Sequence, residues 1–501
     1  MQKTELYRST ALTKKLLATS LGLCLLGGTA LAKDADNTAQ SESGVSDQTA
    51  SYHSAGNQPG TGGFSGPDST KSLWDQDQLL GSMGGLRYWL LNYGVTVNLT
   101  ETSEYLGNTS GGTKQGFDYD GLTTMTLQLD TKRAFNWYGG TFNVSALEMH
   151  GSNVSAHNLQ SLQTASGIEA DNGVRVWEAW YDQLLWHNQA DIKVGQQSLD
   201  QEFMVSSNAL LFVNTMFGWP MVPSADMIGG GPAYPLSSPG VRIRLQPEGA
   251  PAWTFLGGVF DDNPSGLGPT SDKDSQRLNS YGTNFRVNDS ALVIGEVQYS
   301  FPSVGDSERG DQKTLPGTYR LGGWYDFGQF ADQRFGTDGL SLALGNGDPR
   351  IHRGNYSIYA VGDQMVWREN AENVGGVSLF FRGMGAPSDR NQITYSINAG
   401  ITYHEPFEHR ENDTVGLGLG YANVSSADRE LDADSGLPIK RSGETFVEAT
   451  YQYAIAPWWQ VQPDVQYVMN PGAGITDPNN PTSTKRLGNE LVIGLRTNIT
   501  F

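Results

Sequence analysis

From Gly94 to the C-terminus, the chain alternates apolar and polar residues with a period of two. Successive side chains of a strand point to opposite faces, so each alternating run predicts a strand with one apolar and one polar face. The longer runs approach about ten residues, the length with which a tilted strand crosses a bilayer. Clear apolar rows are Val95/Val97/Leu99, Met125/Leu127/Leu129, Val241/Ile243/Leu245, Ile393/Tyr395/Ile397, Val415/Leu417/Leu419 and Leu491/Ile493/Leu495.

Aromatic residues gather towards the ends of these runs, which is typical of the two aromatic girdles of a membrane barrel. The connections also differ in length: residues 247–251, 288–291 and 454–457 read as tight turns, and 198–238, 328–354 and 425–442 as long polar loops. We therefore predict an all-β, antiparallel transmembrane β-barrel with short periplasmic turns and long extracellular loops. Its apolar rows face lipid and its polar rows line a lumen.

The alternation leaves two values open for the number of strands. Weaker runs included, the sequence offers roughly seventeen candidates, whereas a bacterial single-chain barrel has an even number of strands. Either Tyr281–Val287 or Val377–Phe381 is then not a strand, or one run is missed. About sixteen strands is the preferred count, and about eighteen is the alternative.

The N-terminal part divides into three segments. Residues 1–32 have a basic start, a short apolar stretch and the small-residue site Ala30-Leu31-Ala32, which is typical of a secretory signal peptide. Residues 33–72 are polar and predict a disordered leader. Residues 73–93 predict a short helical or plug-like segment, and residues 94–501 form the barrel.

Composition and charge exclude several classes of protein. The formal net charge of -20 argues against a nucleic-acid partner. Cys24, the single cysteine, lies in the predicted signal peptide, and the seven histidines are scattered. No metalloprotease or nucleophile-elbow motif occurs, and the Asp432–Gly436 stretch lacks the glycine and glutamate of a calcium loop. We predict no catalytic residues, no metal and no cofactor.

Several stretches of this sequence occur together in one known family. They are "GGLRYWLLNYGVTVNL" from Gly84, "YLGNTSGG" from Tyr105, "VWEAWYDQ" from Val176, "KVGQQSLDQEF" from Lys193, "FGWPMVPSADMIGGGPAYPLSSPGVRIRLQP" from Phe217, "LPGTYRLGGWYDFGQFADQR" from Leu315, "HRGNYSIYAVGDQMVWRE" from His352 and "DTVGLGLGYANVS" from Asp413. Over about Leu80 to Phe501 the chain resembles the carbohydrate-selective outer-membrane porins of the OprB family.

This resemblance implies a sixteen-stranded barrel in the Gram-negative outer membrane that lets sugars, glucose-like monosaccharides among them, diffuse into the periplasm. It also implies that Asp200–Ser238 folds inward and narrows the pore. The terminal Phe501 resembles the signal that the barrel-assembly machinery reads. Outer-membrane lipid and lipopolysaccharide would surround such a barrel.

Sugar passage needs hydrogen-bonding groups that replace water and aromatic surface for the sugar faces, without tight binding. Arg242 and Arg244 are the sharpest candidates, because two planar donor forks lie on the wet face of one strand. The aromatic residues Phe217, Trp219 and Tyr234 of the predicted inward loop could supply the ring surface. Further charged candidates on polar rows are Lys193, Arg320, Arg382, Arg496, Glu296 and Glu448, together with Glu178, whose row also holds Val174 and Val176.

Two other classes of protein remain alternatives. A soluble, secreted carbohydrate-binding β protein would bury the same apolar rows inside a sandwich, and a barrel enzyme would need a site assembled from distant strands. The sequence also leaves open the preferred sugar or polyol, and whether the protein is a monomer or a homo-oligomer.

Overall fold

The computed structural model describes residues 72–265, 274–288, 290–301, 315–368, 375–480 and 484–501. All of them belong to a unit that spans residues 50–501. The predicted signal peptide and the predicted polar leader, except for Ser72, lie outside the described residues.

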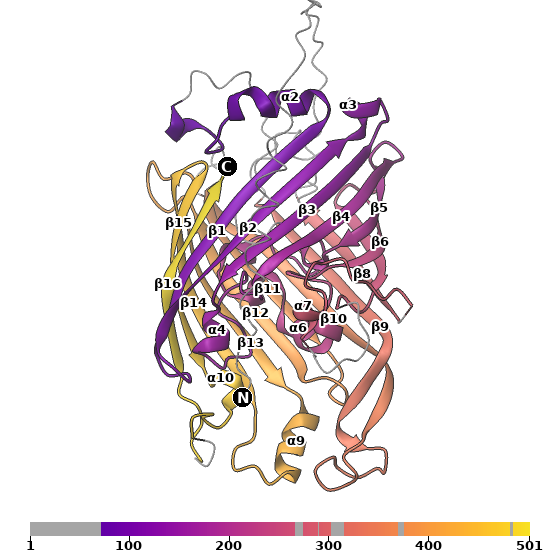
Figure 1. Ribbon diagram of the computed structural model, residues 1–501, viewed down its shortest axis with the longest axis vertical. Helices are drawn as coiled ribbons and strands as arrows, with labels where there is room; N and C mark the ends of the chain where they lie inside the picture. Colours follow the sequence, from indigo (N-terminus) through magenta and orange to yellow (C-terminus); the bar gives the residue numbers. More distant parts are fainter. Residues whose placement is uncertain (1–71, 266–273, 289, 302–314, 369–374, 481–483) are drawn as a thin grey trace, which may run out of the picture. The chain divides into compact units, whose positions relative to one another are not determined.

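Sixteen strands form one closed antiparallel barrel in which each strand pairs with its neighbours in the sequence, and β1 pairs with β16 (Figure 1). The predicted barrel is confirmed, with the preferred count of sixteen. The strands are β1 (Val95–Ser110), β2 (Gly116–Asp130), β3 (Gly140–Gly151), β4 (Gly173–Leu185), β5 (Ala190–Gln197), β6 (Ser238–Leu245), β7 (Trp253–Asp261), β8 (Ala291–Phe301), β9 (Gly317–Gly336), β10 (Pro349–Arg368), β11 (Gly376–Gly385), β12 (Ile393–His404), β13 (Thr414–Val424), β14 (Gly443–Ala456), β15 (Trp459–Met469) and β16 (Glu490–Thr500).

The last strand closes the barrel on the first. Its register places Thr500 opposite Thr100 and Leu495 opposite Tyr105, and the Phe501 amide donates to the Leu99 carbonyl at 2.9 Å. Closure leaves no sheet edge with unpaired backbone groups, which hydrocarbon could not satisfy.

One of the two short runs was expected not to be a strand, and Tyr281–Val287 is that run, because it lies in the connection between β7 and β8, whereas Val377–Phe381 is part of β11. Two other details of the sequence prediction are wrong. The stretch from residue 288 to 291 does not join two strands directly, because β7 ends at Asp261 and Ala291 already begins β8. Most of Gly328–Gly354 is strand, because β9 and β10 continue to pair beyond Tyr325, for example at Ala331 and Ile351.

Short helices occupy the connections and the N-terminal segment. None of those within the described residues has the length and apolarity that a membrane-crossing helix requires. Leu79 and Leu73 tie the segment before β1 to the barrel, through Thr500 (2.8 Å) and the indole of Trp458 (2.9 Å). The helices are η1 (Leu73–Asp75), η2 (Met83–Gly85), α2 (Leu86–Asn92), α3 (Thr131–Phe135), α4 (Val154–His157), η3 (Leu199–Gln201), η4 (Ala209–Leu211), α5 (Thr215–Gly218), α6 (Met221–Asp226), η5 (Ile228–Gly230), α7 (Ser275–Leu278), α9 (Ser426–Asp434) and α10 (Pro471–Gly474).

The two faces of the strands differ as the alternation predicts. On β6, Val241 and Ile243 are exposed on the outer face, and Arg242 between them is buried on the inner face. The largest apolar cluster lies inside the barrel, where inward-facing Trp324, Phe380 and Phe446 pack against residues from the β5–β6 connection. The lumen is therefore filled in part by protein.

Candidate functional site

The connection between β5 and β6, residues 198–237, crosses the lumen and is called the inner loop below. Its two ends are joined by a 2.7 Å hydrogen bond from the Leu199 amide to the Pro232 carbonyl. Between these ends, its backbone contacts inward-facing side chains from strands around the barrel.

Three glutamates on the inner face of the wall accept hydrogen bonds from inner-loop amides. Glu178 on β4 accepts from the Ser198 amide at 3.1 Å, and Glu296 on β8 accepts from the Met204 amide at 2.9 Å. Glu448 on β14 accepts from the Val213 and Asn214 amides at 2.6 and 3.1 Å. A buried amide without a partner is costly, so each carboxylate stabilises the loop at one position.

Arg382 on β11 donates hydrogen bonds to carbonyl groups of the inner loop. Its guanidinium donates to the carbonyls of Met204 (2.9 Å), Phe217 (3.1 Å) and Gly218 (3.2 Å), and also to that of Met216. The planar fork of five N–H donors suits such a set of diverging acceptors. With 1% of its surface exposed, Arg382 is a positioning residue for the inner loop.

Asp363 and Arg320 hold the start of the loop from neighbouring strands. Asp363 on β10 accepts from the Ser206 hydroxyl (2.6 Å) and from the Asn208 side-chain amide (3.0 Å). Arg320 on β9 donates to Asp363 at 2.9 Å and lies 3.9 Å from Glu296. These contacts link two of the loop anchors into one network.

Arg496 on β16 contacts both the wall and the loop. It pairs with Glu104 on β1 at 2.5 Å, across the strand pair that closes the barrel, and donates to the Val213 carbonyl at 3.4 Å. Both side chains of this pair are buried.

Glycines on the inner face of β13 make room for the aromatic residues of the loop. A Cβ atom on Gly418 would lie 2.6 Å from Cζ of Phe217, and one on Gly416 would lie 2.8 Å from Cζ of Phe212. The two phenyl rings stack with centroids 4.4 Å apart. The "GLGLG" stretch from Gly416 is thus the part of the wall against which the loop packs.

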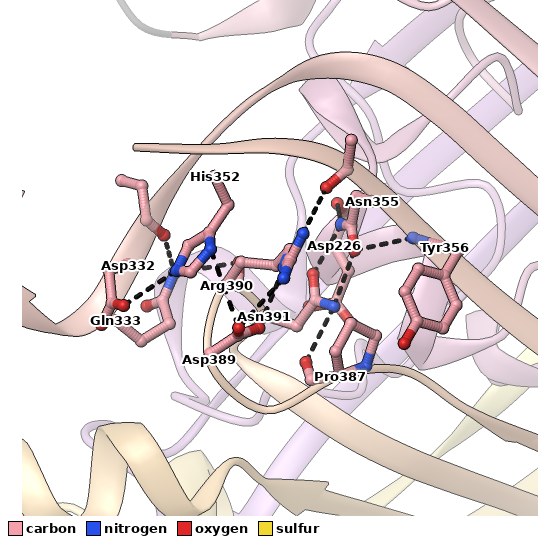
Figure 2. Close-up of polar contacts among 12 residues, drawn as sticks. Asp226, Asp332, Gln333, His352, Asn355, Tyr356, Pro387, Asp389, Arg390 and Asn391 are labelled. Atoms are coloured by element: carbon pink, nitrogen blue, oxygen red, sulfur yellow. Dashed lines mark hydrogen bonds and ion pairs between the residues drawn. The ribbon is translucent and has the colours of Figure 1, made fainter. Parts of the chain in front are cut away.

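Figure 2 shows how α6 of the inner loop is fixed near the start of β10 and the β11–β12 connection. The side chain of Asn355 donates to the Asp226 carbonyl at 3.0 Å, and Asn355 and Asn391 bond to one another at 2.6 and 2.9 Å. The Asp226 carboxylate accepts from the Ile393 amide at 3.2 Å. Burial raises the pKa of Asp226 well above its ordinary value.

A second connection, residues 152–172 between β3 and β4, also folds inward and is called the inner segment. Glu444 on β14 accepts from its Leu162 and Gln163 amides at 2.8 Å each, and Gln466 on β15 donates to its Ala165 carbonyl at 2.8 Å. The segment also touches the inner loop, where the Gly167 amide donates to the Val213 carbonyl at 2.9 Å. The alternation of residue types does not predict this segment.

A polar cluster with accessible groups lies on the inner faces of β4, β5 and β6. Arg242 meets Glu202 through two contacts of 2.7 and 3.1 Å and also pairs with Asp191. Arg244 pairs with Asp191 at 2.5 Å, and Lys193 pairs with Glu202. Asp182 lies 3.6 Å from Arg242.

The same cluster includes an aromatic face. The ammonium of Lys193 lies 4.4 Å from the ring centroid of Trp180, which is partly exposed on the inner row of β4. Side chains of the cluster remain 13–19% exposed at Lys193, Arg244 and Glu202, whereas that of Arg242 is 3% exposed. The following residues, called the polar cluster below, therefore combine donors, acceptors and ring surface: Trp180, Asp182, Asp191, Lys193, Glu202, Arg242 and Arg244.

The structure separates the predicted site residues into two groups. Lys193, Arg242 and Arg244 come together in the polar cluster. The other charged candidates form hydrogen bonds or ion pairs within the protein. Arg496 bonds to Glu104 and to the inner loop. The inner loop is also anchored, directly or through a neighbouring side chain, by Glu178, Glu296, Arg320, Arg382 and Glu448.

The aromatic candidates of the inner loop are buried by packing and do not face open space in the lumen. Phe217 is 1% and Trp219 7% exposed. The indole of Trp219 donates to the Gly230 carbonyl at 2.9 Å, and the hydroxyl of Tyr234 donates to the Ile168 carbonyl at 2.8 Å. Their ring surfaces therefore contribute to the packing of the loop.

In the sequence, Glu178 shares its row with the apolar residues Val174 and Val176, and the structure shows why. Strand β4 has a bulge, because Ser145 pairs with Glu178 and the adjacent Ala146 pairs with Val176, which leaves Trp177 without an opposite residue. A bulge inserts one extra residue and shifts the alternation. Trp177 and Glu178 consequently both point inward, whereas Val174 points outward and is exposed.

Within the described residues, no three His, Cys, Asp or Glu side chains are grouped so that they could hold a metal ion. A closed antiparallel barrel of sixteen strands, with apolar outer rows and an inward-folded loop anchored to polar inner rows, defines the class of outer-membrane porins. A protein of this class resides in the Gram-negative outer membrane, and the lumen is its candidate functional site.

A family model for carbohydrate-selective porins of the OprB family matches residues 114–501. The chain thus belongs to the OprB family of carbohydrate-selective porins. It is 26% identical over 444 residues to Porin B of Pseudomonas aeruginosa, covering 82% of this chain and 90% of that protein. It is 22% identical over 455 residues to the putative porin QuiX of Acinetobacter baylyi, covering 86% and 94%.

A solved structure gives the same fold. The structure of OprB from Pseudomonas putida at high pH superimposes with a TM-score of 0.72 at 22% sequence identity, covering 86% of this chain and all of that one.

Proposed function

We propose that this porin lets carbohydrates diffuse passively into the periplasm, with a preference for glucose-like monosaccharides. The observation that carries the proposal is the polar cluster beside an anchored inner loop. The loop narrows the lumen, and the cluster presents hydrogen-bonding groups to a solute that passes there.

The charge balance of the cluster favours neutral solutes. Its three bases, Lys193, Arg242 and Arg244, are matched by three acids, Asp182, Asp191 and Glu202. Such a set offers donors and acceptors at close spacing without a net charge. Hydroxyl groups can exchange water for these partners one after another, and binding stays weak enough for release.

Arg244 and Lys193 are the residues of this set most suited to meet a solute. Their side chains are 15% and 13% exposed, whereas Arg242 is almost fully occupied by Glu202 and Asp191. Trp180 lies beside Lys193 and offers the ring surface that suits the apolar face of a sugar. We assign Arg242 to positioning and Arg244, Lys193 and Trp180 to solute contact.

Liposome swelling tests the proposal. Proteoliposomes would be placed in isosmotic solutions of glucose, other monosaccharides, polyols and an organic acid, with glycerol as the reference. We expect glucose to enter faster than polyols of similar mass. Arg244→Gln should reduce the ratio of glucose to glycerol rates severalfold, and Arg350→Gln is the matched control, because Arg350 is half exposed near the start of β10. An unchanged ratio in Arg244→Gln would contradict the role of the cluster.

We also propose how this protein is exported and assembled. Residues 1–32 direct export as a cleaved signal peptide, and Phe501 serves as the terminal signal for the assembly machinery. In favour of the second, Phe501 ends the outward row of β16, which closes the barrel.

A further inference from the structure

The connections between β13 and β14 and between β15 and β16 form a pocket that is lined by basic residues. It is called the basic pocket, and its volume of about 420 Å³ is large enough for a small ligand. Four of its lining residues are cations, Arg429, Lys440, Arg441 and Arg486, and one is an acid, Glu430. This balance of charge favours an anion as the ligand.

Three segments of the chain bring the four cations together. Arg429 lies on α9, Lys440 and Arg441 lie between α9 and β14, and Arg486 lies in the β15–β16 connection. The guanidinium of Arg486 donates to the Asn470 side chain at 2.7 Å and to the Lys440 carbonyl at 3.3 Å. These bonds hold the two connections against each other.

The acidic residues of α9 do not neutralise the whole pocket, because each of them already forms an ion pair with one of two arginines. The pairs are Asp428 and Asp432 with Arg441, at 3.1 and 2.9 Å, and Glu430 and Asp434 with Arg334 of β9. Arg441 is therefore occupied by protein, and three cations of the basic pocket remain.

These three cations have charge to offer to a ligand. Among the described residues, Arg429, Lys440 and Arg486 form no ion pair. The Nε atom of Arg429 is buried and has no hydrogen-bond partner in the described part of the chain, and a buried donor without a partner is costly. A phosphate monoester, with several charged acceptor oxygens, would meet arginine forks and a lysine ammonium at once.

The basic pocket lies beside tyrosines that end outward rows of the barrel. Arg429 interacts electrostatically with Tyr421, which follows the exposed apolar row of β13. On β15, the hydroxyl of Tyr467 accepts a 3.1 Å hydrogen bond from Asn489, which itself accepts from the Asn470 amide at 3.0 Å. Tyr467 faces outward and is 41% exposed.

This position decides between two sources of a phosphate group. Tyrosines at the ends of apolar outward rows mark the interface between membrane and water. The connections that form the pocket, residues 425–442 and 470–489, are long, and long connections face the outside of the cell in this class. Phosphorylated head groups of the outer leaflet lie at that level, whereas a free sugar phosphate would be met along the lumen.

We propose that the basic pocket binds a phosphate group of a lipid in the outer leaflet, the lipid A part of lipopolysaccharide. Arg429 and Arg486 donate to the phosphate oxygens from two different connections, and Lys440 adds a third positive charge. The site is separate from the polar cluster, so it attaches the outer connections of the porin to the leaflet and takes no part in sugar passage.

Native mass spectrometry of the full-length porin in detergent tests this site. The probe is lipid A with two phosphates, and the reference is the same lipid with both phosphates removed. We expect the wild type to bind the phosphorylated lipid about tenfold more tightly than the reference. Arg429→Gln with Arg486→Gln should abolish this preference. Lys132→Gln with Arg133→Gln is the matched control, because it removes two exposed cations in α3, at the opposite ends of the strands.

A preference that persists in the Arg429/Arg486 variant, or that is lost equally in the control, would overturn the proposal. Lys440→Gln, a single change at an exposed position, should weaken the preference as well, so the test does not depend on one variant. Glucose swelling should be unchanged in all of these variants, which shows that the barrel is folded. Displacement of lipid A by an equal concentration of glucose 6-phosphate would assign the pocket to a free anion and would contradict the lipid source.

Discussion

The guanidinium of Arg382 on β11 donates a 3.1 Å hydrogen bond to the main-chain carbonyl of Phe217 in the inner loop. Further bonds from the same group reach the carbonyls of Met204, Met216 and Gly218. The alternation of β11 places Arg382 on the inner row, where a water-filled channel would be expected. The side chain instead anchors the inner loop. The polar inner rows of this barrel do two kinds of work, anchoring the loop and lining the remaining path.

Replacing Arg382 with methionine should release the middle of the inner loop. Each buried carbonyl that loses its partner costs about 1–3 kcal/mol unless water replaces the arginine. We expect a larger and noisier single-channel conductance, weaker discrimination between sugars, and a lower temperature for the gel-mobility shift on heating. Arg350→Met, at an exposed position, is the control. Wild-type conductance in Arg382→Met would show that the loop does not depend on this residue.

Gly418→Val should also move the loop, through steric contact rather than lost hydrogen bonds. The new side chain would meet Phe217, whose ring is already packed against Phe212, Phe380 and Phe446. Overpacking of this kind costs typically about 1–3 kcal/mol. Gly257→Val is the matched control on β7, because the nearest atom to a Cβ there is 3.8 Å away. Changed conductance and heat stability in Gly418→Val alone would support the packing; equal effects in both variants would not.

The strands and their faces could be predicted from the sequence, because a period of two is a local property. Two residues depart from the alternation, and both departures have a cause that only the three-dimensional structure shows. Glu178 follows a bulge at Trp177. On β9, the inward-facing residue Trp324 is apolar because it belongs to the apolar cluster that includes residues of the inner loop.

The pH dependence of ion selectivity should reveal Glu169 of the inner segment. Burial, and the nearby Glu104 and Asp118 carboxylates, raise its pKa to about 7, although hydrogen bonds from Ser155 act in the opposite direction. A raised carboxylate pKa means that the group is neutral below that pH and becomes negative above it. We expect cation selectivity to increase as the pH rises through about 7, measured as the reversal potential in a KCl gradient.

Glu169→Gln should flatten this dependence between about pH 6 and 8. Because ionisation of the buried carboxylate disfavours the folded state above its ordinary pKa, the variant should be as stable as the wild type or more stable at the upper end of that range. An unchanged pH profile in Glu169→Gln would assign the titration to another group.

Trp180→Ala should weaken sugar recognition without freeing the inner loop. The alanine variant lacks the ring face that would pack against the sugar, so glucose inhibition of ion current should require a concentration severalfold higher. Trp180→Phe keeps a ring and should restore most of the effect. If alanine and phenylalanine behave alike, the ring face has no part in passage.

The role of each inward-facing side chain could not be predicted from its position in the alternating row. Arg244 and Arg382 both lie on polar rows, yet Arg244 is partly exposed, whereas Arg382 is enclosed by carbonyl groups of the inner loop. That difference depends on where residues 198–237 run in space, a long-range property. Asp363 and Trp180 lie on the inner rows of β10 and β4 and could have been found by the same parity argument, but the inner segment has no comparable periodic signal.

The central claim, that the inner loop crosses the lumen, is tested most directly by a thiol cross-link between loop and wall. Ser206 and Asp363 are the pair to test, because the Ser206 hydroxyl donates to the Asp363 carboxylate at 2.6 Å. With Cys24 replaced by serine, Ser206→Cys/Asp363→Cys should be cross-linked by a short bifunctional thiol reagent in intact outer membranes, while Ser206→Cys paired with Ser435→Cys on the exposed end of the α9 connection should not. Cross-linking of the second pair, or no cross-linking of the first although both thiols react with small reagents, would contradict the account.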